Sequence, residues 1–311
     1  MKRMTDRKIV LITQRTRLQD LVRRYNTVGQ ARFYIEHHGG DFADYEAEDS
    51  TYQAAVAAAV SALECCGRLQ VVDRDYIGNF LFGERDLVVA VGRDGLVANT
   101  LKYLTSQNLI GVNPDPKRWD GVLLPFAAGD LKTVVPETLG GLRRVKTVTL
   151  AEARLSDGQT LCGVNDIFIG QRTHASARYE LCAGGRREIQ SSSGIIVSTG
   201  LGSTGWLKSV LAGAAGVGRG CGWSAVAEPA AAMPWDARYL RYAVREPYPS
   251  KSTGAGLVFG KIEADAPITV TSFMAENGVI FSDGMERDSL EFNAGAVATV
   301  GLAAKTGRLV I

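Results

Sequence analysis

The sequence of 311 residues lacks the features that would assign it to a membrane or to the secreted class. None of its apolar runs reaches the roughly 18 to 20 residues that a membrane span needs. The first ten residues, MKRMTDRKIV, are basic but contain neither the apolar segment nor the cleavage site of a secretory signal. We therefore expect a cytoplasmic protein without a membrane partner.

Cysteine and histidine are also scarce, with 5 and 3 residues respectively. The cysteines form no C-x-x-C pair, and their odd number argues against a disulfide framework. We therefore expect reduced, mostly buried thiols. Neither residue type has the spacing of structural zinc ligands. The prediction is that the protein has no metal-binding cluster of its own.

An excess of charge of one sign is missing as well, because 35 Lys and Arg residues face 33 Asp and Glu residues. This balance produces no field that would attract nucleic acid, so we predict no nucleic-acid partner. Any anionic ligand must be held by a local group of residues. Hydrophobic residues make up 46% of the chain, an ordinary globular composition, and the length suits two domains of about 150 residues each.

The first part of the chain alternates apolar runs with helical patterns. We predict strands at residues 8–13, 69–73, 86–91 and 109–113, and helical segments at 17–37, 50–65 and 96–104. This alternation is typical of a parallel sheet covered by helices on both faces. We assign an α/β domain to residues 1–140.

After about residue 140, short strand patterns separated by turn residues dominate. We predict strands within residues 145–153, 155–164, 165–169, 177–182, 194–199, 262–280 and 297–311. One helix is expected at about 206–215, and the glycine-rich residues 214–222 are predicted to form a loop. We assign residues 141–311 to a mainly β sandwich domain. Whether its last strands return to the first domain stays open.

The first candidate site is the sequence Gly92-Arg93-Asp94-Gly95, which follows a predicted buried strand and precedes a helix. Open α/β sheets bind ligands at the carboxyl ends of their strands, and amides at a helix start can face a phosphate. Glycine lets the backbone approach a ligand, while Asp94 can accept a proton or hold a metal ion. A tight turn with a helix-capping Asp is the alternative.

The second candidate is the segment STGLGSTGW at residues 198–206, again between a strand and a helix. Its amides and hydroxyls can cradle a phosphate or a ribose. It lacks the Gly-Lys-Ser/Thr of a P-loop, and Leu201 stands where a nucleophile elbow requires glycine, which argues against a serine hydrolase. A simple turn with a helix cap is the alternative.

The third candidate is the pair Asn165-Asp166, at the start of a predicted strand. An amide next to a carboxylate can hydrogen-bond an adenine edge and a ribose diol. Such pairs are also common in plain turns. A dehydrogenase is disfavoured, because the G-x-G-x-x-G fingerprint is missing after the first strand.

In this order, the segments resemble the signatures of the NAD kinase family, which is grouped with diacylglycerol and sphingosine kinases. DLVVAVGRDG resembles the family's strand and G-G-D-G loop, LIGVNPDPKRWDGVLLPF its next strand, and VNDIFIG its Asn-Glu segment. SSSGIIVSTGLGSTGW resembles D-G-L-I-V-S-T-P-T-G-S-T-A-Y, and the C-terminal sequence from FSDG onward resembles the closing Asp-Gly hairpin and final strands. The resemblance is close over residues 86–213 and loose over about the last 35 residues.

The resemblance implies an NAD kinase-like fold with NAD in a cleft between the domains. It further implies transfer of the γ-phosphoryl group of ATP, with Mg²⁺, to the adenosine 2'-hydroxyl of NAD. Asp94 would be the catalytic base or hydroxyl-orienting group. The nucleotide-binding residues would be Gly92, Arg93, Gly95, Asn165, Asp166, Thr204, Gly205, Trp206 and Ser209. A homodimer or homotetramer is expected.

Five residues depart from the family pattern. Arg93 replaces the second glycine of G-G-D-G, and Leu96 stands where many members carry a hydroxyl or amide residue. Asp166 replaces Glu, Trp206 replaces Tyr, and Ser193 replaces an acid that the family uses at the nicotinamide end. The alternatives are therefore a kinase of the same fold for a sugar, nucleoside or lipid, and a catalytically silent NAD/ATP-binding sensor. The choice between ATP and polyphosphate as the donor stays open.

Overall fold

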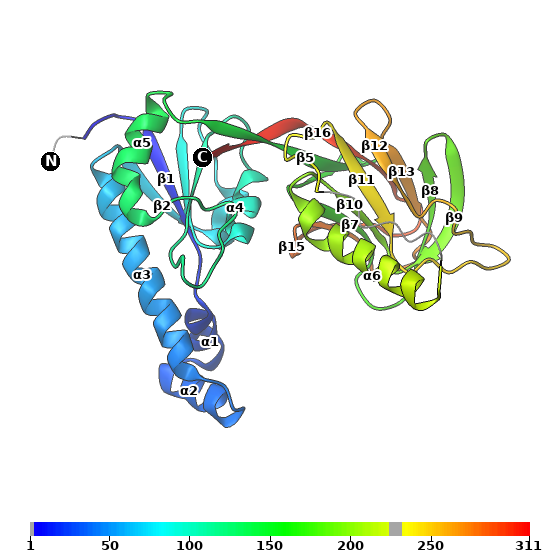
Figure 1. Cartoon of the computed structure of the whole chain (residues 1–311), viewed down its shortest axis with the longest axis horizontal. Helices are drawn as coiled ribbons and strands as arrows, with labels where there is room; N and C mark the ends of the chain where they lie inside the picture. The colour runs from blue at the N-terminus through cyan, green and yellow to red at the C-terminus, as the bar shows by residue number, and fades with distance from the viewer. Residues whose placement is uncertain (1–2, 224–231) are drawn as a thin grey trace. The chain divides into compact units, whose positions relative to one another are not determined.

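The computed structural model describes residues 3–223 and 232–311, and the chain divides into two compact units (Figure 1). Unit 1 comprises Met1–Lys146 and Arg308–Ile311, and unit 2 comprises Thr147–Gly307. The chain leaves unit 1 in strand β5 (Val145–Leu155) and comes back to it at the end of strand β16 (Val297–Val310). The last strand therefore contributes residues to both units.

Unit 1 is built on a parallel sheet with the strand order β2-β1-β3-β4, next to which the end of β16 pairs in parallel. The strands are β1 (Lys8–Thr13), β2 (Arg68–Asp73), β3 (Leu87–Val91) and β4 (Leu109–Val112). All residues of β3 and β4 are buried. Their continuous apolar sequences are those of strands covered on both faces.

Helices cover both faces of this sheet (Figure 1). Ile9 and Leu11 pack under α3 and α5, while Val10 and Ile12, which point to the other face, are also fully buried. The helical elements are α1 (Arg17–Tyr25), α2 (Val28–His37), α3 (Phe42–Glu64), η1 (Arg74–Asn79), α4 (Asp94–Leu101), η2 (Ala128–Asp130) and α5 (Leu131–Leu139).

Two helical predictions in unit 1 need correction. The segment predicted as one helical region forms two helices, because Asn26 ends α1 in the left-handed conformation (φ 69°) and Thr27 then caps α2. The hydroxyl of Thr27 accepts a hydrogen bond from the amide of Gln30 at 3.1 Å, which is the standard N-cap arrangement. Helix α5, which contains Pro136, was not predicted.

Unit 2 contains two largely antiparallel sheets. One has the order β16-β13-β8-β9 with β5 and β6 attached, and the other has the order β12-β11-β10-β7-β14-β15. Residues from both sheets, including Tyr179, Ile195, Ile280 and Phe292, form one core, as in a sandwich. The remaining elements are β6 (Thr160–Gly163), β7 (Asp166–Gln171), β8 (Ala177–Ala183), β9 (Arg186–Ser192), β10 (Ile195–Ser198), η3 (Gly202–Thr204), α6 (Trp206–Gly220), β11 (Tyr239–Val244), β12 (Phe259–Glu263), β13 (Ile268–Ser272), β14 (Gly278–Ser282) and β15 (Met285–Glu291).

The predicted fold class is confirmed, since a parallel α/β unit is followed by a mainly β unit. The predicted loop at residues 214–222 is wrong, because α6 continues to Gly220. Glycine costs a helix about 1 kcal/mol relative to alanine. The burial of Leu207, Ala215 and Gly218 on one side of α6 offsets this cost.

The structure also bears on the membrane and thiol predictions. Within the described residues, the helices are all too short or too polar to cross a bilayer. The five cysteines are free, as expected from their spacing, but only Cys66 is buried and Cys221 is exposed. The prediction of mostly buried thiols is therefore wrong.

The glycines at the end of α6 provide a test of the helix boundary. Gly216 lies inside the helix with open space around the position of a Cβ, so Gly216→Ala should raise the free energy of unfolding by about 1 kcal/mol. Gly222 has φ +73°, so Gly222→Ala should lower it by about 1 kcal/mol. Urea unfolding measures both, and equal effects of the two substitutions would contradict the boundary.

Candidate functional site

The Gly92–Gly95 turn lies where the sequence predicts it, at the carboxyl end of β3. Arg93 occupies the N-cap position of α4, and the helix begins at Asp94, two positions before the predicted start at Leu96. Oδ1 of Asp94 accepts a hydrogen bond from the backbone N–H of Leu123 at 2.8 Å. This bond fixes the half-buried carboxylate against the segment that follows β4.

The two glycines of this turn differ in the space available for a side chain. A Cβ at Gly92 would lie 2.7 Å from Cδ2 of Leu96 and 3.2 Å from Cδ of Gln14. A Cβ at Gly95 would meet nothing within 4 Å. Gly92 therefore serves packing within the protein, whereas the exposed backbone at Gly95 is open to a ligand.

Arg93, which replaces the second glycine of the resembled G-G-D-G loop, is held by other side chains. Its Nη2 lies 2.8 Å from Oε1 of Glu48, and its guanidinium carbon lies 4.0 Å from the ring centroid of Trp119. The Glu48 side chain is only 9% exposed and also forms an ion pair with Arg17. A buried carboxylate requires such cationic partners. Arg93 is therefore part of a structural ion-pair group, with its own side chain 40% exposed.

Asp44 extends this group of ion pairs on α3. Its Oδ1 lies 2.7 Å from Nη2 of Arg118, and its Oδ2 lies 2.7 Å from Nη2 of Arg17. Hydrogen bonds from Arg118 and then Arg17 lower the pKa of Asp44 to about 2. The resulting arginine–carboxylate network consists of Arg17, Asp44, Glu48, Arg93 and Arg118. Its members lie up to about 100 positions apart in the sequence, so no local sequence pattern predicts the network.

In unit 2, the second and third candidate motifs meet where β7 begins and the neighbouring strand β10 ends. β7 begins at Asp166 and pairs antiparallel with β10, so that Asp166 lies opposite Ser198. The hydroxyl of Thr199 donates to the carbonyl oxygen of Val164, and the N–H of Thr199 donates to the carbonyl oxygen of Asn165 at 3.0 Å. The Asn165-Asp166 pair and the segment after β10 are therefore bonded to each other.

Two glycines allow this close approach. A Cβ at Gly202 would lie 1.9 Å from the carbonyl oxygen of Asn165, and a Cβ at Gly200 would lie 1.8 Å from the carbonyl oxygen of Pro234. The hydroxyl of Ser203 donates to the carbonyl oxygen of Gly200 and accepts from the N–H of Met233 at 2.9 Å. No residue with a side chain fits at position 200 or 202 in this arrangement.

Asp283 is a site residue that the sequence reasoning did not select. Its carboxylate accepts hydrogen bonds from three successive N–H groups, those of Val164 at 3.0 Å, Asn165 at 2.6 Å and Asp166 at 3.3 Å. Its backbone is in the left-handed region (φ 54°) in the turn between β14 and β15. The Asp-Gly turn in the closing hairpin was the only sequence signal that could have identified it.

Asp166 is buried beside Asp283, and this location changes its acidity. Burial, with a smaller contribution from the negative charge of Asp283, raises the pKa of Asp166 to about 7. A carboxyl group in such surroundings resists ionisation. Near neutral pH, Asp166 can therefore either donate a hydrogen bond as an acid or accept one as a carboxylate.

The remaining predicted residues lie at the start of α6. Gly205 is the N-cap residue and Trp206 the first residue of the helix, while Thr204, Gly205 and Ser209 are exposed. The half-buried Trp206 ring stacks on Phe168 at a centroid distance of 5.6 Å, and the guanidinium carbon of Arg245 lies 5.3 Å from its centroid. Trp206 thus combines an aromatic surface with a neighbouring cation.

Ser193, which replaces the family's acidic residue, lies against Arg245. The N–H of Ser193 donates to the carbonyl oxygen of Arg245 at 2.9 Å, and Nη1 of Arg245 approaches the carbonyl oxygen of Ser193 at 3.5 Å. The position that the resemblance assigns to an acid is therefore neutral, and it adjoins a cation.

The carboxylate in the turn after β3 suits a magnesium ion that is bound mainly through the phosphates of a nucleotide. The described residues include no group of three or more His, Cys, Asp or Glu side chains placed to hold a metal ion. Mg²⁺ in phosphoryl-transfer sites is commonly held by one or two carboxylates together with substrate phosphates. Because Oδ1 of Asp94 is bonded to Leu123, Oδ2 is the oxygen that remains for either a metal ion or a substrate hydroxyl.

Comparisons with known proteins show a fold match without a sequence match. No protein-family profile matches the chain, and no curated protein is significantly similar in sequence. Among solved structures, yeast NADH kinase complexed with NADH matches with a TM-score of 0.61 and 14% identity, covering 98% of this chain and 84% of that one. An NAD kinase from Archaeoglobus fulgidus in complex with ATP matches with a TM-score of 0.55 and 15% identity, covering 98% and 93%. The chain has an NAD kinase-like fold and is a divergent example of it.

The acidity of Asp166 predicts how stability depends on pH. Its folded-state pKa of about 7 lies above the ordinary value near 3.9. The folded protein therefore keeps a proton that the unfolded chain releases between about pH 4 and 7, and stability falls as the pH rises through this range. Each pKa unit corresponds to about 1.4 kcal/mol.

We expect the Asp166→Asn variant to lose less stability than the wild type between pH 5 and 8 in urea unfolding experiments. Asp265→Asn, at an exposed position of unit 2, is the matched control and should follow the wild-type profile. Parallel profiles for Asp166→Asn and the wild type would contradict the raised pKa.

Proposed function

We propose that this protein is a phosphotransferase that moves the γ-phosphoryl group of ATP to the adenosine 2'-hydroxyl of an NAD-type dinucleotide. The observation that carries the proposal is the arrangement in unit 2, where Asn165-Asp166 is bonded to the Thr199–Gly202 segment. The match to folds solved with NADH and with ATP supports it.

The acceptor nucleoside is assigned to residues of unit 2. The half-buried side chain of Asn165 has no hydrogen-bond partner among the described residues, so its amide can bind an adenine or ribose edge. Asp166 can bind a ribose hydroxyl. The Trp206 ring offers a stacking surface for a base, since aromatic faces attract planar rings. Thr204 and Ser209 contribute hydroxyl groups at the exposed start of α6.

The phosphoryl transfer itself is assigned to the turn after β3. Oδ2 of Asp94 accepts the proton of the attacking hydroxyl, while the bond from Leu123 to Oδ1 keeps the carboxylate in one orientation. The exposed backbone at Gly95 and the start of α4 face the phosphates, and Gly92 allows the tight packing of the turn that presents them. Mg²⁺, when bound with ATP, would neutralise phosphate charge. Transfer to a hydroxyl requires mainly positioning and charge stabilisation, which these groups supply.

A second candidate acceptor is the reduced dinucleotide. The nicotinamide ring is positively charged in NAD and neutral in NADH. In the family pattern, an acid stands at position 193, whereas here Ser193 adjoins Arg245. Without the acid at position 193, and with the positive charge of Arg245 close by, binding of the positively charged nicotinamide ring of NAD is disfavoured. We infer that NADH competes with NAD as the acceptor, or is preferred to it.

The test is to incubate the purified protein with ATP and Mg²⁺ and with either NAD or NADH, and to quantify NADP or NADPH. We expect product from the wild type, with NADH at least as good as NAD. Asp94→Asn should lower kcat by about 10²- to 10⁴-fold, the usual contribution of a general base. Asp265→Asn, an exposed carboxylate of unit 2, is the matched control and should retain activity.

Other outcomes would refute parts of the proposal. Binding of NAD or ATP without product would indicate a silent sensor. ATP consumption only with a sugar, nucleoside or lipid would indicate another acceptor, and product from polyphosphate alone would indicate another donor. Equal activity of Asp94→Asn and the wild type would remove Asp94 from its catalytic role.

A further inference from the structure

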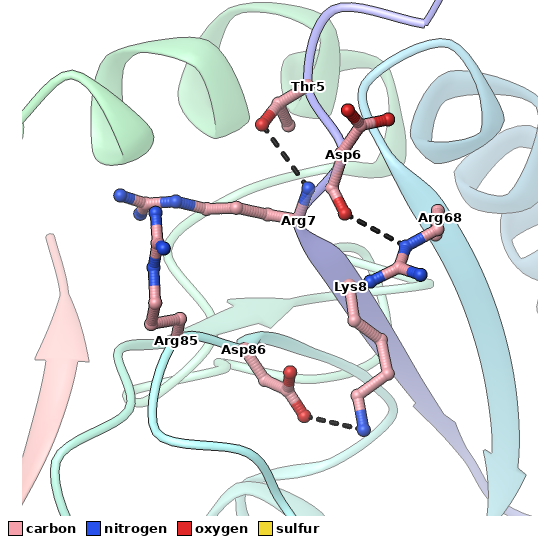
Figure 2. A pocket seen from close by; sticks show the side chains of 7 residues that line it. All are labelled: Thr5, Asp6, Arg7, Lys8, Arg68, Arg85 and Asp86. Atoms are coloured by element: carbon pink, nitrogen blue, oxygen red, sulfur yellow. Dashed lines mark hydrogen bonds and ion pairs between the residues drawn. The ribbon is translucent and has the colours of Figure 1, made fainter.

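A cavity of about 590 Å³ lies in unit 1 at the amino-terminal ends of β1, β2 and β3 (Figure 2). It is lined by Thr5, Asp6, Arg7, Lys8, Arg68, Arg85 and Asp86. The Gly92–Gly95 turn follows the other end of β3. The cavity is therefore separate from the residues assigned to phosphoryl transfer.

The lining of this cavity has an excess of positive charge. It contains four cationic side chains, Arg7, Lys8, Arg68 and Arg85, and two carboxylates, Asp6 and Asp86. Asp86 is already engaged, because it lies 2.8 Å from Nζ of Lys8 and accepts a hydrogen bond from the N–H of Gly83 at 2.8 Å. Its negative charge is thus matched by Lys8, and the three arginines face only Asp6.

Asp6 does not neutralise these arginines. Nε of Arg68 donates to the backbone oxygen of Asp6 at 2.8 Å, not to its carboxylate. Figure 2 shows the exposed Asp6 carboxylate directed away from the guanidinium groups of Arg7 and Arg85. Neither of these two arginines forms an ion pair within the described part of the chain. Uncompensated guanidinium groups at one cavity repel each other unless an anion lies between them.

An adjoining cavity of about 200 Å³ shares part of this lining and adds one carboxylate and one arginine. Arg7, Arg85 and Asp86 line both cavities, and the second adds Glu84 and Arg308. Nε of Arg308 donates to Oδ1 of Asn108 at 2.8 Å, a neutral partner that leaves the charge of the arginine in place. Arg7 and Arg85 thus line both cavities. Arg68 is an additional arginine in the first cavity, and Arg308 is one in the second.

We propose that these cavities form a second anion site, which binds the phosphate chain of a small ligand. Guanidinium groups form paired hydrogen bonds to phosphate oxygens, and a set of arginines in one cavity suits two or three linked phosphates better than one. The chain as a whole carries a net charge of only +2, so the local cluster favours a compact polyanion over nucleic acid. This inference does not depend on the proposed kinase activity.

The test is calorimetric titration of the full chain with inorganic pyrophosphate and inorganic triphosphate, at low salt and without Mg²⁺. We expect the wild type to bind triphosphate more tightly than pyrophosphate. The double variant Arg7→Gln/Arg85→Gln should bind triphosphate at least 10-fold more weakly. Arg172→Gln, at an exposed arginine of unit 2, is the matched control and should bind as the wild type does.

Two further measurements make the test specific. Triphosphate should slow amide hydrogen exchange in residues 5–8 and 84–86, and it should raise the melting temperature of the wild type but not that of the double variant. Titration of the wild type and the double variant with ADP distinguishes the source of the phosphates. An affinity above that of pyrophosphate that the double variant loses indicates a nucleotide, and an affinity equal to that of pyrophosphate indicates the phosphate chain alone.

Three results would overturn the proposal. The wild type could fail to bind any of the three probes, or the double variant, folded according to its circular dichroism spectrum, could bind triphosphate as tightly as the wild type. Protection confined to the amides of residues 92–96 would also overturn it, because the anion would then occupy only the turn after β3. These binding measurements do not require kinase activity, so they can be interpreted even if the protein forms no NADP or NADPH.

Discussion

The carboxylate of Asp283 binds three successive amides, those of Val164, Asn165 and Asp166, and the candidate acceptor site depends on this interaction. It fixes the backbone just before β7, which places the Asn165 side chain and the Asp166 carboxyl group. On the other side of the same segment, the carbonyl oxygens of Val164 and Asn165 accept hydrogen bonds from Thr199. Donors and acceptors of one short segment are thereby satisfied from two directions.

The electrostatics of the two units follow from local burial. In unit 2, burial beside Asp283 keeps Asp166 protonated more readily than an ordinary aspartate. In unit 1, the buried Glu48 is compensated by arginines, and one of them is Arg93 from the turn after β3. The arginine at the second glycine position of the resembled G-G-D-G loop therefore has a structural partner. The cationic cavity at the opposite end of β3 has no such compensation at Arg7 and Arg85.

The sequence was informative where a signal is local. The strands of unit 1 were predicted within a residue or so, because continuous apolar runs such as those in β3 and β4 mark strands buried on both faces. The turn at Gly92–Gly95 was placed after β3 for the same reason. The hydrogen bonds that join the segments around Asn165 and Thr199 were not predicted. Helix α6 was cut short in the prediction, because its glycines lower helix propensity while its buried residues favour the helix.

Interactions between distant residues could not be predicted in this way. Asp283 bonds to residues that precede it by nearly 120 positions, and the arginine–carboxylate network joins Arg17 to Arg118 through α3. A single aspartate in an Asp-Gly turn has no feature that reveals its partners. The resemblance to the NAD kinase family identified the fold, which the structural matches support, but it did not identify these stabilising contacts.

The most direct test of this account is the affinity for NAD and NADH, measured by calorimetry for the wild type and for Asp283→Gly. Glycine tolerates the left-handed backbone at position 283 and removes the carboxylate together with its methylene group. The account predicts that the wild type binds at least one of the two dinucleotides and that the variant, still folded by circular dichroism, binds it at least 10-fold more weakly. Equal affinity of the variant and the wild type would contradict the claim that Asp283 organises the acceptor site.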